Sequence, residues 1–219
     1  MDSLGAMGTV TLPTVVPAPE GKPLRSETDE TQSRSRRIAQ DPAYWNEQEA
    51  AAIAARFDLL AEIWDEERSS YRSAPLADAL ARGGPLPKGT CVELGSGTGV
   101  LTPLLLEHWP ITFCVDLSAG MLRKARSGIR LRADSCRLPL RSGSAAVVVL
   151  GDTSLFAQEV VRLLHRDGVV IWLNALGADA PHFVPTEVLL AAFERASARR
   201  WDAVQSQALW GQWVVLRRQ

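Results

Sequence analysis

The segment of this sequence with the clearest chemical potential is glycine-rich and reads VELGSGTG from Val92 to Gly99. A short β-rich run precedes the glycines, and a helical pattern begins at Val100. Glycines at such a strand–loop–helix junction let the backbone turn tightly and let a ligand approach the main chain. The N-terminus of the next helix offers unpaired N–H groups and a positive dipole end. These features suit a carboxylate or a phosphate equally.

The spacing of the glycines separates two classes of ligand. A dinucleotide-binding loop has the pattern Gly-x-Gly-x-x-Gly. Here the third glycine, Gly99, comes one residue early, and Val100 occupies the dinucleotide position. An acid, Glu93, also stands two residues before the first glycine, Gly95. The spacing therefore disfavours a nicotinamide oxidoreductase and favours an adenosyl amino acid as the ligand.

Two aspartates follow the next two predicted strands. Asp116 comes directly after the strand 111–115, where a carboxylate can accept hydrogen bonds from both ribose hydroxyls of an adenosine. Asp134 follows the strand 129–133, where it could accept from the adenine amino group. The alternative role of each is a loop or helix-capping acid. Both lie at carboxyl ends of predicted parallel strands, where open α/β sheets bind their ligands.

Strand and helix patterns alternate through the rest of the chain, which predicts a parallel sheet with helices on both faces. After the last of these, a helix over 186–197 is followed by two strands, 201–208 and 212–217, compatible with an antiparallel pair. The alternating strands are predicted at 90–94, 111–115, 129–133, 145–150 and 169–174, and the helices at 100–108, 118–126 and 155–165.

The N-terminal part divides into two segments. Residues 1–40 mix proline, glycine, serine and charge without a period, and we expect a disordered tail there. Compact structure is expected from Asp41 and Pro42, which are typical of a helix start. A helical pattern follows over 42–80, with a second short helix from Pro75 to Arg82. Residues 41–82 are thus predicted to form cap helices, and 88–219 the core of one domain.

Together these segments resemble the class I S-adenosylmethionine-dependent methyltransferases. The resemblance covers about Phe57 to Arg217 and is carried, in order, by VELGSGTG, VDLSAGMLRKAR, RADSCRLPL and EVVRLLHRDGVVIWLN. It implies a doubly wound, Rossmann-like α/β fold with N-terminal cap helices. Its seven-stranded sheet would be mostly parallel with an antiparallel last strand. It also implies S-adenosylmethionine as the cofactor and methyl transfer as the activity.

The resemblance further implies roles for single residues. The methionine part of the cofactor would lie against the glycine loop, and the nucleoside against the two aspartates. An aromatic residue of the cap, Trp64 or Tyr71, would close over the cofactor, although core packing is the alternative for Trp64. The implied contacts are Glu93, Gly95, Ser96, Gly97 and Gly99 for methionine, Asp116, Leu117 and Met121 for ribose and adenine, Asp134 and Ser135 for the adenine edge, and Leu150 and Gly151 for the sulfonium.

The sequence gives fewer signals for the acceptor side, the part of the site that would bind the methyl acceptor. The segment Gly151–Ser154 reads GDTS and lacks the Asn/Asp-Pro-Pro-aromatic motif of methylases that act on planar amines in nucleic acid or glutamine. His182, on a loop after the fifth strand, is the first candidate for a general base, and Asp152 the second. Four aromatic residues suggest a flat, apolar small molecule, with core packing as the alternative reading: Tyr44, Trp45, Phe57 and Phe183.

Composition and charge limit the classes of binding partner and the compartment that we expect. The formal net charge is −1, so no global positive field favours nucleic acid. Three cysteines lack metal-ligand spacing and fit a reducing compartment. With no membrane segment or secretory signal apparent, we expect a cytoplasmic enzyme without a metal that methylates O or N of a small molecule, as a monomer or homodimer. The alternatives are an RNA or protein methyltransferase, and a related fold that uses the cofactor for non-methylation chemistry.

Overall fold

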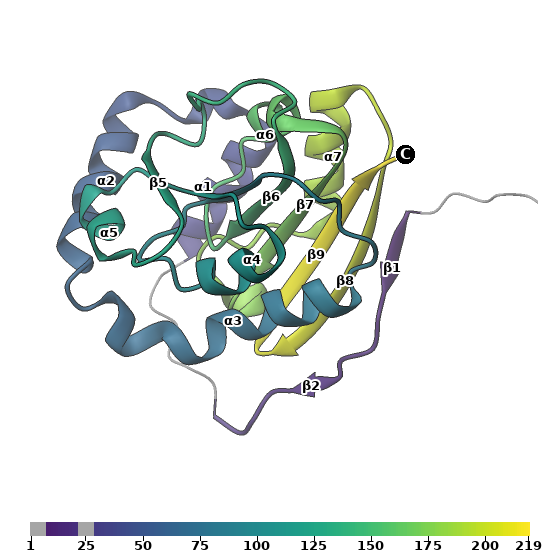
Figure 1. The fold of residues 1–219 in the computed structure, drawn as a ribbon, viewed down its shortest axis with the longest axis horizontal. Coiled ribbons are helices and arrows are strands. Elements are labelled where there is room, and N and C mark those ends of the chain that lie inside the picture. Colours follow the sequence, from purple (N-terminus) through teal and green to yellow (C-terminus); the bar gives the residue numbers. More distant parts are fainter. Residues whose placement is uncertain (1–7, 22–28) are drawn as a thin grey trace, which may run out of the picture.

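The computed structural model describes residues 8–21 and 29–219, with only the backbone described for residues 29 and 65–70. One sheet runs through the molecule in the order β1-β8-β9-β7-β6-β3-β4-β5, with β2 paired to β8 (Figure 1). Its central strands are parallel and correspond to the five predicted ones. They are β3 (Cys91–Leu94), β4 (Thr112–Asp116), β5 (Ile129–Arg132), β6 (Ala145–Gly151) and β7 (Leu164–Asn174).

The order of the strands reverses at β3. From β3 the chain proceeds outward to β4 and β5, then crosses back to β6 and β7 on the other side. The strand β9 (Gly211–Arg218) lies between β7 and β8 (Trp201–Leu209) and is antiparallel to both. The doubly wound fold with an antiparallel last strand is thereby confirmed. Open α/β sheets bind ligands at such a reversal, outside the carboxyl ends of the strands.

The N-terminal residues depart from the expected tail. Two short strands, β1 (Thr9–Thr11) and β2 (Val16–Pro17), add to β8 and raise the strand number from the expected seven to nine. Helix α1 (Asp29–Gln40) packs beside α7 and buries Ile38 completely. The expectation of disorder is therefore wrong for residues 8–21 and 29–40, while residues 1–7 and 22–28 lie outside the described part. The prediction failed because α1 is polar and has few apolar residues to reveal a period.

The cap that follows is divided more finely than the sequence predicts. Asp41 accepts from the Ala43 N–H (3.0 Å) and caps a short 3-10 helix, η1 (Pro42–Tyr44). Asn46 then caps α2 (Glu47–Leu60). Helix α3 (Trp64–Arg82) continues through Pro75, so the expected separate helix from Pro75 to Arg82 is the last part of α3.

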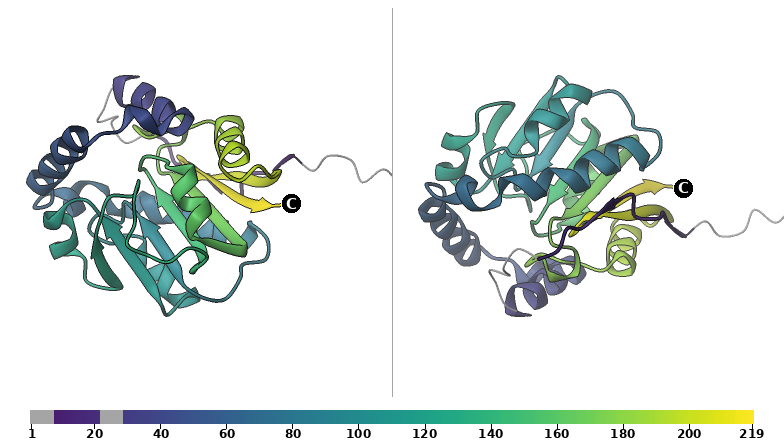
Figure 2. Two further views of the ribbon diagram at one scale, coloured as in Figure 1. Left: turned by 90° about the horizontal axis from the view of Figure 1, so that it is seen from above. Right: turned by 90° about the horizontal axis from the view of Figure 1, so that it is seen from below.

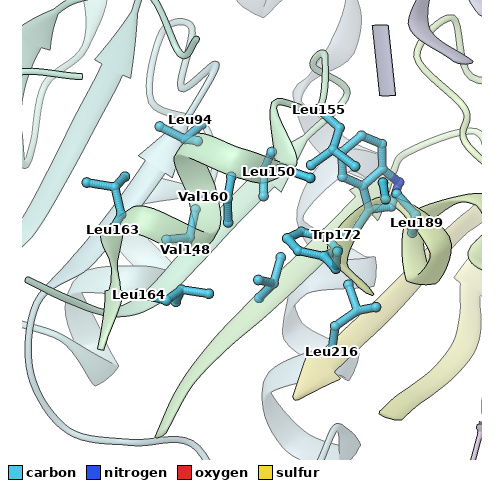
Figure 3. Close-up of a cluster of buried hydrophobic side chains, with 14 of the residues drawn as sticks. Leu94, Val148, Leu150, Leu155, Val160, Leu163, Leu164, Trp172, Leu189 and Leu216 are labelled. Atoms are coloured by element: carbon cyan, nitrogen blue, oxygen red, sulfur yellow. The ribbon is translucent and has the colours of Figure 1, made fainter. Parts of the chain in front are cut away.

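Helices cover both faces of the sheet (Figure 2). Helix α3 and α4 (Thr102–His108) lie on one face. Helices α6 (Ala157–Leu163) and α7 (Thr186–Ser197) lie on the other, with α1 against α7. A hydrophobic core fills each interface, and Figure 3 shows Leu150 and Trp172 within the one under α6 and α7. Because both faces are covered, every residue from Ala145 to Leu150 in β6 is buried.

Candidate functional site

A cavity of about 390 Å³ opens at the carboxyl ends of β3, β4, β6 and β7, bordered by residues of the cap helices. It lies at the reversal of strand order, where the fold predicts a ligand site. The structure brings most of the predicted site residues together in its lining, namely Trp64, Tyr71, Glu93, Gly95, Ser96, Gly97, Asp116, Leu117, Met121, Asp134, Ser135, Gly151, Asp152 and His182.

Two predicted contacts, Leu150 and Gly99, lie outside this lining. Leu150 is fully buried in the core beneath α6 (Figure 3), because successive side chains of a strand point to opposite faces. Gly99 has a φ of +80°, and a Cβ there would lie 3.1 Å from the Thr102 hydroxyl oxygen. Its role is to turn the chain into α4, since only glycine adopts this backbone easily.

The loop between β3 and α4 presents its backbone and one hydroxyl to the cavity. Gly97 has a φ of +56°, and a Cβ built on it would only approach Trp64 Nε1 and Met121 Sδ, at 3.9 and 4.0 Å. The Ser96 hydroxyl is buried and has no hydrogen-bond partner among the described residues. A buried hydroxyl of this kind normally has a partner. The loop therefore fits a polar ligand that supplies that partner.

Asp116 is held in a fixed orientation at the end of β4. Its Oδ2 accepts from the Gly97 N–H and its Oδ1 from the Ser118 N–H, each at 2.8 Å. Burial raises the pKa of the Asp116 carboxyl, and the two N–H donors oppose that rise. Each oxygen retains a further lone pair, so a carboxylate in this position can still accept from a pair of hydroxyls.

Glu93 is the most deeply buried acid of the cavity. It lies on β3 and accepts from the Thr102 hydroxyl at 2.6 Å. Burial raises the pKa of Glu93 to about 7, and the negative charge of Asp116 contributes in the same direction. A cationic group placed beside it would favour the ionised form. Its position therefore suits the ammonium end of an amino acid.

Asp134 is bound by a residue that the sequence analysis assigned to the acceptor side. The Trp45 indole N–H donates to Asp134 Oδ2 at 2.8 Å, and the Cys136 N–H donates to Oδ1 at 2.9 Å. Trp45 also packs edge-on against Phe156, with ring centroids 5.4 Å apart. Trp45 therefore belongs to the end of the cavity that contains Asp134. Sequence patterns could not find this pair because 89 residues separate its members.

Helix α2 is joined to the segment that follows Asp116. Asp58 accepts from the Ser118 hydroxyl at 2.5 Å and from the Gly120 N–H at 2.6 Å. These two hydrogen bonds lower the pKa of Asp58. Ser118 itself caps α5 (Ala119–Lys124), as its position after the strand predicts. Asp58 carried no sequence signal, since its partners lie about sixty residues away.

Trp64 and Tyr71 line the cavity from α3. Trp64 packs edge-on against Phe57, with ring centroids 5.4 Å apart, and the Arg72 guanidinium lies 4.9 Å from its ring centroid. Tyr71 packs edge-on against Trp210 at 6.0 Å. Of the four aromatic residues predicted for the acceptor side, Phe57 and Trp45 line the cavity, whereas Tyr44 and Phe183 do not.

His182 and Asp152 lie at the other end of the cavity. The Ser35 hydroxyl of α1 is 2.9 Å from His182 Nδ1. The pKa of His182 is lowered to about 4, mainly by burial; the positive charges of nearby arginines act in the same direction, while Asp152 opposes them. Asp152 has a φ of +47° and accepts from the Ala175 N–H at 3.2 Å and the Asn174 amide at 3.3 Å. Arg72 approaches its carboxylate at 4.0 Å.

Among the residues whose side chains the structure describes (8–21, 30–64 and 71–219), no group of three or more potential ligands could hold a metal ion. None of the described helices is long and apolar enough to span a membrane.

Comparison with known sequences identifies related proteins. Residues 92–172 match the family described as "Methyltransferase domain". A curated relative, trans-aconitate 2-methyltransferase of Azoarcus sp. (strain BH72), is 32% identical over 123 residues, which are 49% of this chain and 49% of the relative. The chain thus spans about half the length of that relative. Residues 92–172, which the family model matches, contain the glycine loop and Asp116.

Solved structures show the same fold at low sequence identity. A SAM-dependent methyltransferase from Aquifex aeolicus aligns with a TM-score of 0.58 and 14% identity, covering 73% of this chain and 97% of the other. Phosphoethanolamine N-methyltransferase 1 of Haemonchus contortus, solved with phosphoethanolamine and S-adenosylhomocysteine, also aligns with a TM-score of 0.58 and 14% identity. That alignment covers 77% of this chain and 48% of the other.

Proposed function

We propose that this chain, which belongs to the class I S-adenosylmethionine-dependent methyltransferases, transfers the cofactor's methyl group to a small molecule bound in the same cavity. The observation that carries the proposal is the position of Asp116. Its carboxylate is fixed beside the glycine loop by the Gly97 N–H and faces the cavity. A nucleoside ribose held there would place the rest of the cofactor along the loop.

The residues of the cavity fit each part of this cofactor. Glu93 and the Ser96 hydroxyl are suited to the methionine end, because one is a buried acid and the other a buried hydroxyl without a partner among the described residues. Asp116 is suited to the ribose hydroxyls. Asp134, oriented by Trp45, is suited to the adenine amino group. When bound, the cofactor supplies a methyl group already activated by a sulfonium.

The protein must then hold the acceptor atom in line with the methyl group, about 3 Å away, and exclude water. We assign His182 as the group that removes a proton where the acceptor requires it. Its lowered pKa keeps the imidazole neutral at physiological pH, and the Ser35 hydroxyl fixes its Nδ1 side. Asp152 is held by the Ala175 N–H and supports the same region electrostatically.

A small acceptor is favoured over a macromolecule. A cavity of about 390 Å³ lies within the usual range for small ligands. The net charge of −1 gives no attraction to RNA. The curated relative is named for a small acceptor, trans-aconitate. The three free cysteines support the cytoplasm as the proposed compartment, since thiols persist in reducing surroundings.

The cofactor assignment is tested by calorimetry with S-adenosylhomocysteine. Asp116→Ala should weaken binding by about 1–3 kcal/mol, because the ribose hydrogen bonds are lost. Asp167→Ala is the matched control, since Asp167 is exposed in the first part of β7 and does not line the cavity. Unchanged affinity in the Asp116 variant would remove the ribose assignment.

The acceptor class is tested separately. Release of S-adenosylhomocysteine on addition of small acceptors to the enzyme with S-adenosylmethionine would support small-molecule methylation. Binding to RNA at low salt that weakens steeply as salt rises would instead favour the RNA methyltransferase alternative. Cofactor binding without turnover of any small molecule, peptide or RNA would point to the use of the fold for other chemistry.

A further inference from the structure

Two arginines line the cavity although the sequence offers no motif for either. Arg56 comes from α2 and Arg72 from α3. The Arg72 guanidinium carbon lies over the Trp64 ring, 4.9 Å from its centroid, and both side chains line the cavity. Its Nε is buried and has no hydrogen-bond partner among the described residues. Guanidinium N–H groups in such a position are suited to an oxyanion.

Among the described side chains, the acid that approaches Arg72 is Asp152, and its contact with the guanidinium is loose. The two side chains are 4.0 Å apart, which is the outer limit for an ion pair. The Asp152 carboxylate is already engaged by the Ala175 N–H and the Asn174 amide. Among the residues whose side chains are described, Arg72 Nε therefore remains without a hydrogen-bond partner.

The charges of the cavity are distributed unevenly. Its acids other than Asp152 are Glu93, Asp116 and Asp134, which accompany the glycine loop and the strand ends assigned to the cofactor. We call this set the acidic end, and Arg56, Arg72 and His182 the basic end. Burial is the main cause of the lowered pKa of His182, and the charges of Arg34, Arg56 and Arg72 add to it while Asp152 opposes them, so three cationic side chains act on this end of the cavity.

We propose that the methyl acceptor is a small carboxylic acid in its ionised form, held at the basic end by Arg72 with support from Arg56. This rests on the proposed function. A carboxylate matches the planar fork of a guanidinium and can form two parallel hydrogen bonds with it. A neutral or cationic acceptor would offer no matching oxyanion to the buried Nε of Arg72, and a buried polar atom without a partner costs free energy.

The cofactor's own carboxylate is the other anion that could reach Arg72. The two sources share the same chemistry but predict different results for an Arg72 variant. If the guanidinium holds the acceptor, the variant binds S-adenosylhomocysteine normally and binds acids poorly. If it holds the methionine carboxylate, S-adenosylhomocysteine itself binds poorly and acids are unaffected.

The experiment titrates protein saturated with S-adenosylhomocysteine with small acids, including succinate, glutarate, citrate and benzoate, and with their uncharged amides. We expect millimolar or tighter binding of at least one acid and no binding of its amide. Arg72→Gln should weaken acid binding by about tenfold or more, while its affinity for S-adenosylhomocysteine changes less than about twofold. Arg72→Lys, which keeps the charge but loses the fork, should bind acids with intermediate affinity.

Arg141→Gln is the matched control, because Arg141 is exposed and lies outside the cavity. Melting temperatures of all variants establish that they are folded. The proposal is overturned if no acid binds at millimolar concentration, if the amides bind as well as the acids, or if Arg72→Gln weakens S-adenosylhomocysteine alone. Failure of the wild-type protein to bind S-adenosylhomocysteine would remove the proposed function, and titration of acids into the ligand-free protein would still test the anion site.

Discussion

The two ends of the cavity differ in how they are built as well as in charge. The acids of the acidic end lie within the last residues of a strand of the sheet or just after it, so each acid is positioned by its strand. The basic end is assembled from α2, α3 and the loop after β7, with Ser35 of α1 in contact with His182, and these segments are remote in sequence. The first end therefore depends on the sheet, whereas the second depends on how the cap helices pack.

The strongest test of this division is removal of residues 1–40. Helix α1 buries Ile38, and the Gln32 side chain donates to the carbonyls of Ala178 and Ala180, each at 2.9 Å. Losing these contacts should lower the free energy of unfolding by about 3–5 kcal/mol, measured by urea denaturation. The affinity of the folded fraction for S-adenosylhomocysteine should change little.

Deletion of residues 1–21 provides the comparison, because it removes β1 and β2 and retains α1. It should cost less stability than the longer deletion. Equal stability of the full chain and the protein lacking residues 1–40 would mean that α1 does not support the basic end.

The second test uses the pH dependence that Glu93 gives to the acidic end. The pKa of Glu93 is raised from 4.5 to about 7. The protonated side chain therefore contributes its full stabilisation below a pH of about 4.5, and this stabilisation is lost as the pH rises through about 7. Between about pH 5 and pH 8 the ligand-free protein should lose on the order of 3 kcal/mol relative to Glu93→Gln.

Urea denaturation at several pH values measures this difference, with the exposed Glu187→Gln as control. Saturating S-adenosylhomocysteine should reduce the difference, because its ammonium group would stabilise the Glu93 carboxylate. An identical pH dependence of stability in wild type and Glu93→Gln would contradict the account of Glu93.

The smallest expected effect comes from Trp45→Phe. This change keeps an aromatic ring against Phe156 but removes the hydrogen bond to Asp134. Affinity for S-adenosylhomocysteine should fall by about 1 kcal/mol in calorimetry. Trp109→Phe is the matched control, because it loses a hydrogen bond to the Pro87 carbonyl outside the cavity. If the two variants bind equally well, Trp45 does not orient the acid at the adenine position.

The sequence predicted the acidic end because its information is local. Glu93, Gly97 and Asp116 each lie in or just after a predicted strand, so a short stretch of sequence is enough to predict their positions. The structure places all three in the lining of the cavity. Contacts between distant segments left no such pattern. The contact between Ser35 and His182 spans 147 residues, and it comes from a helix too polar to be recognised.

The elements of the fold were likewise predicted where the sequence signal is local and missed where it is not. Buried strands such as β6 were predicted almost to the residue, because a continuous apolar run has few other interpretations. The strands β1 and β2 were missed because they are two or three residues long, exposed, and added to the outside of β8. Their pairing depends on an edge of the sheet that exists only after the remainder has folded.

The hydrogen bonds of Asp58 couple the cap to the nucleoside site. The carboxylate of Asp58 joins α2 to Ser118 and Gly120, only two and four residues beyond Asp116. The Ser118 N–H also donates to Asp116 itself. An outward movement of α2 would therefore pull on the stretch of backbone that orients Asp116. If Asp116 holds the ribose as proposed, whatever steadies α2 should also prolong the residence of the nucleoside.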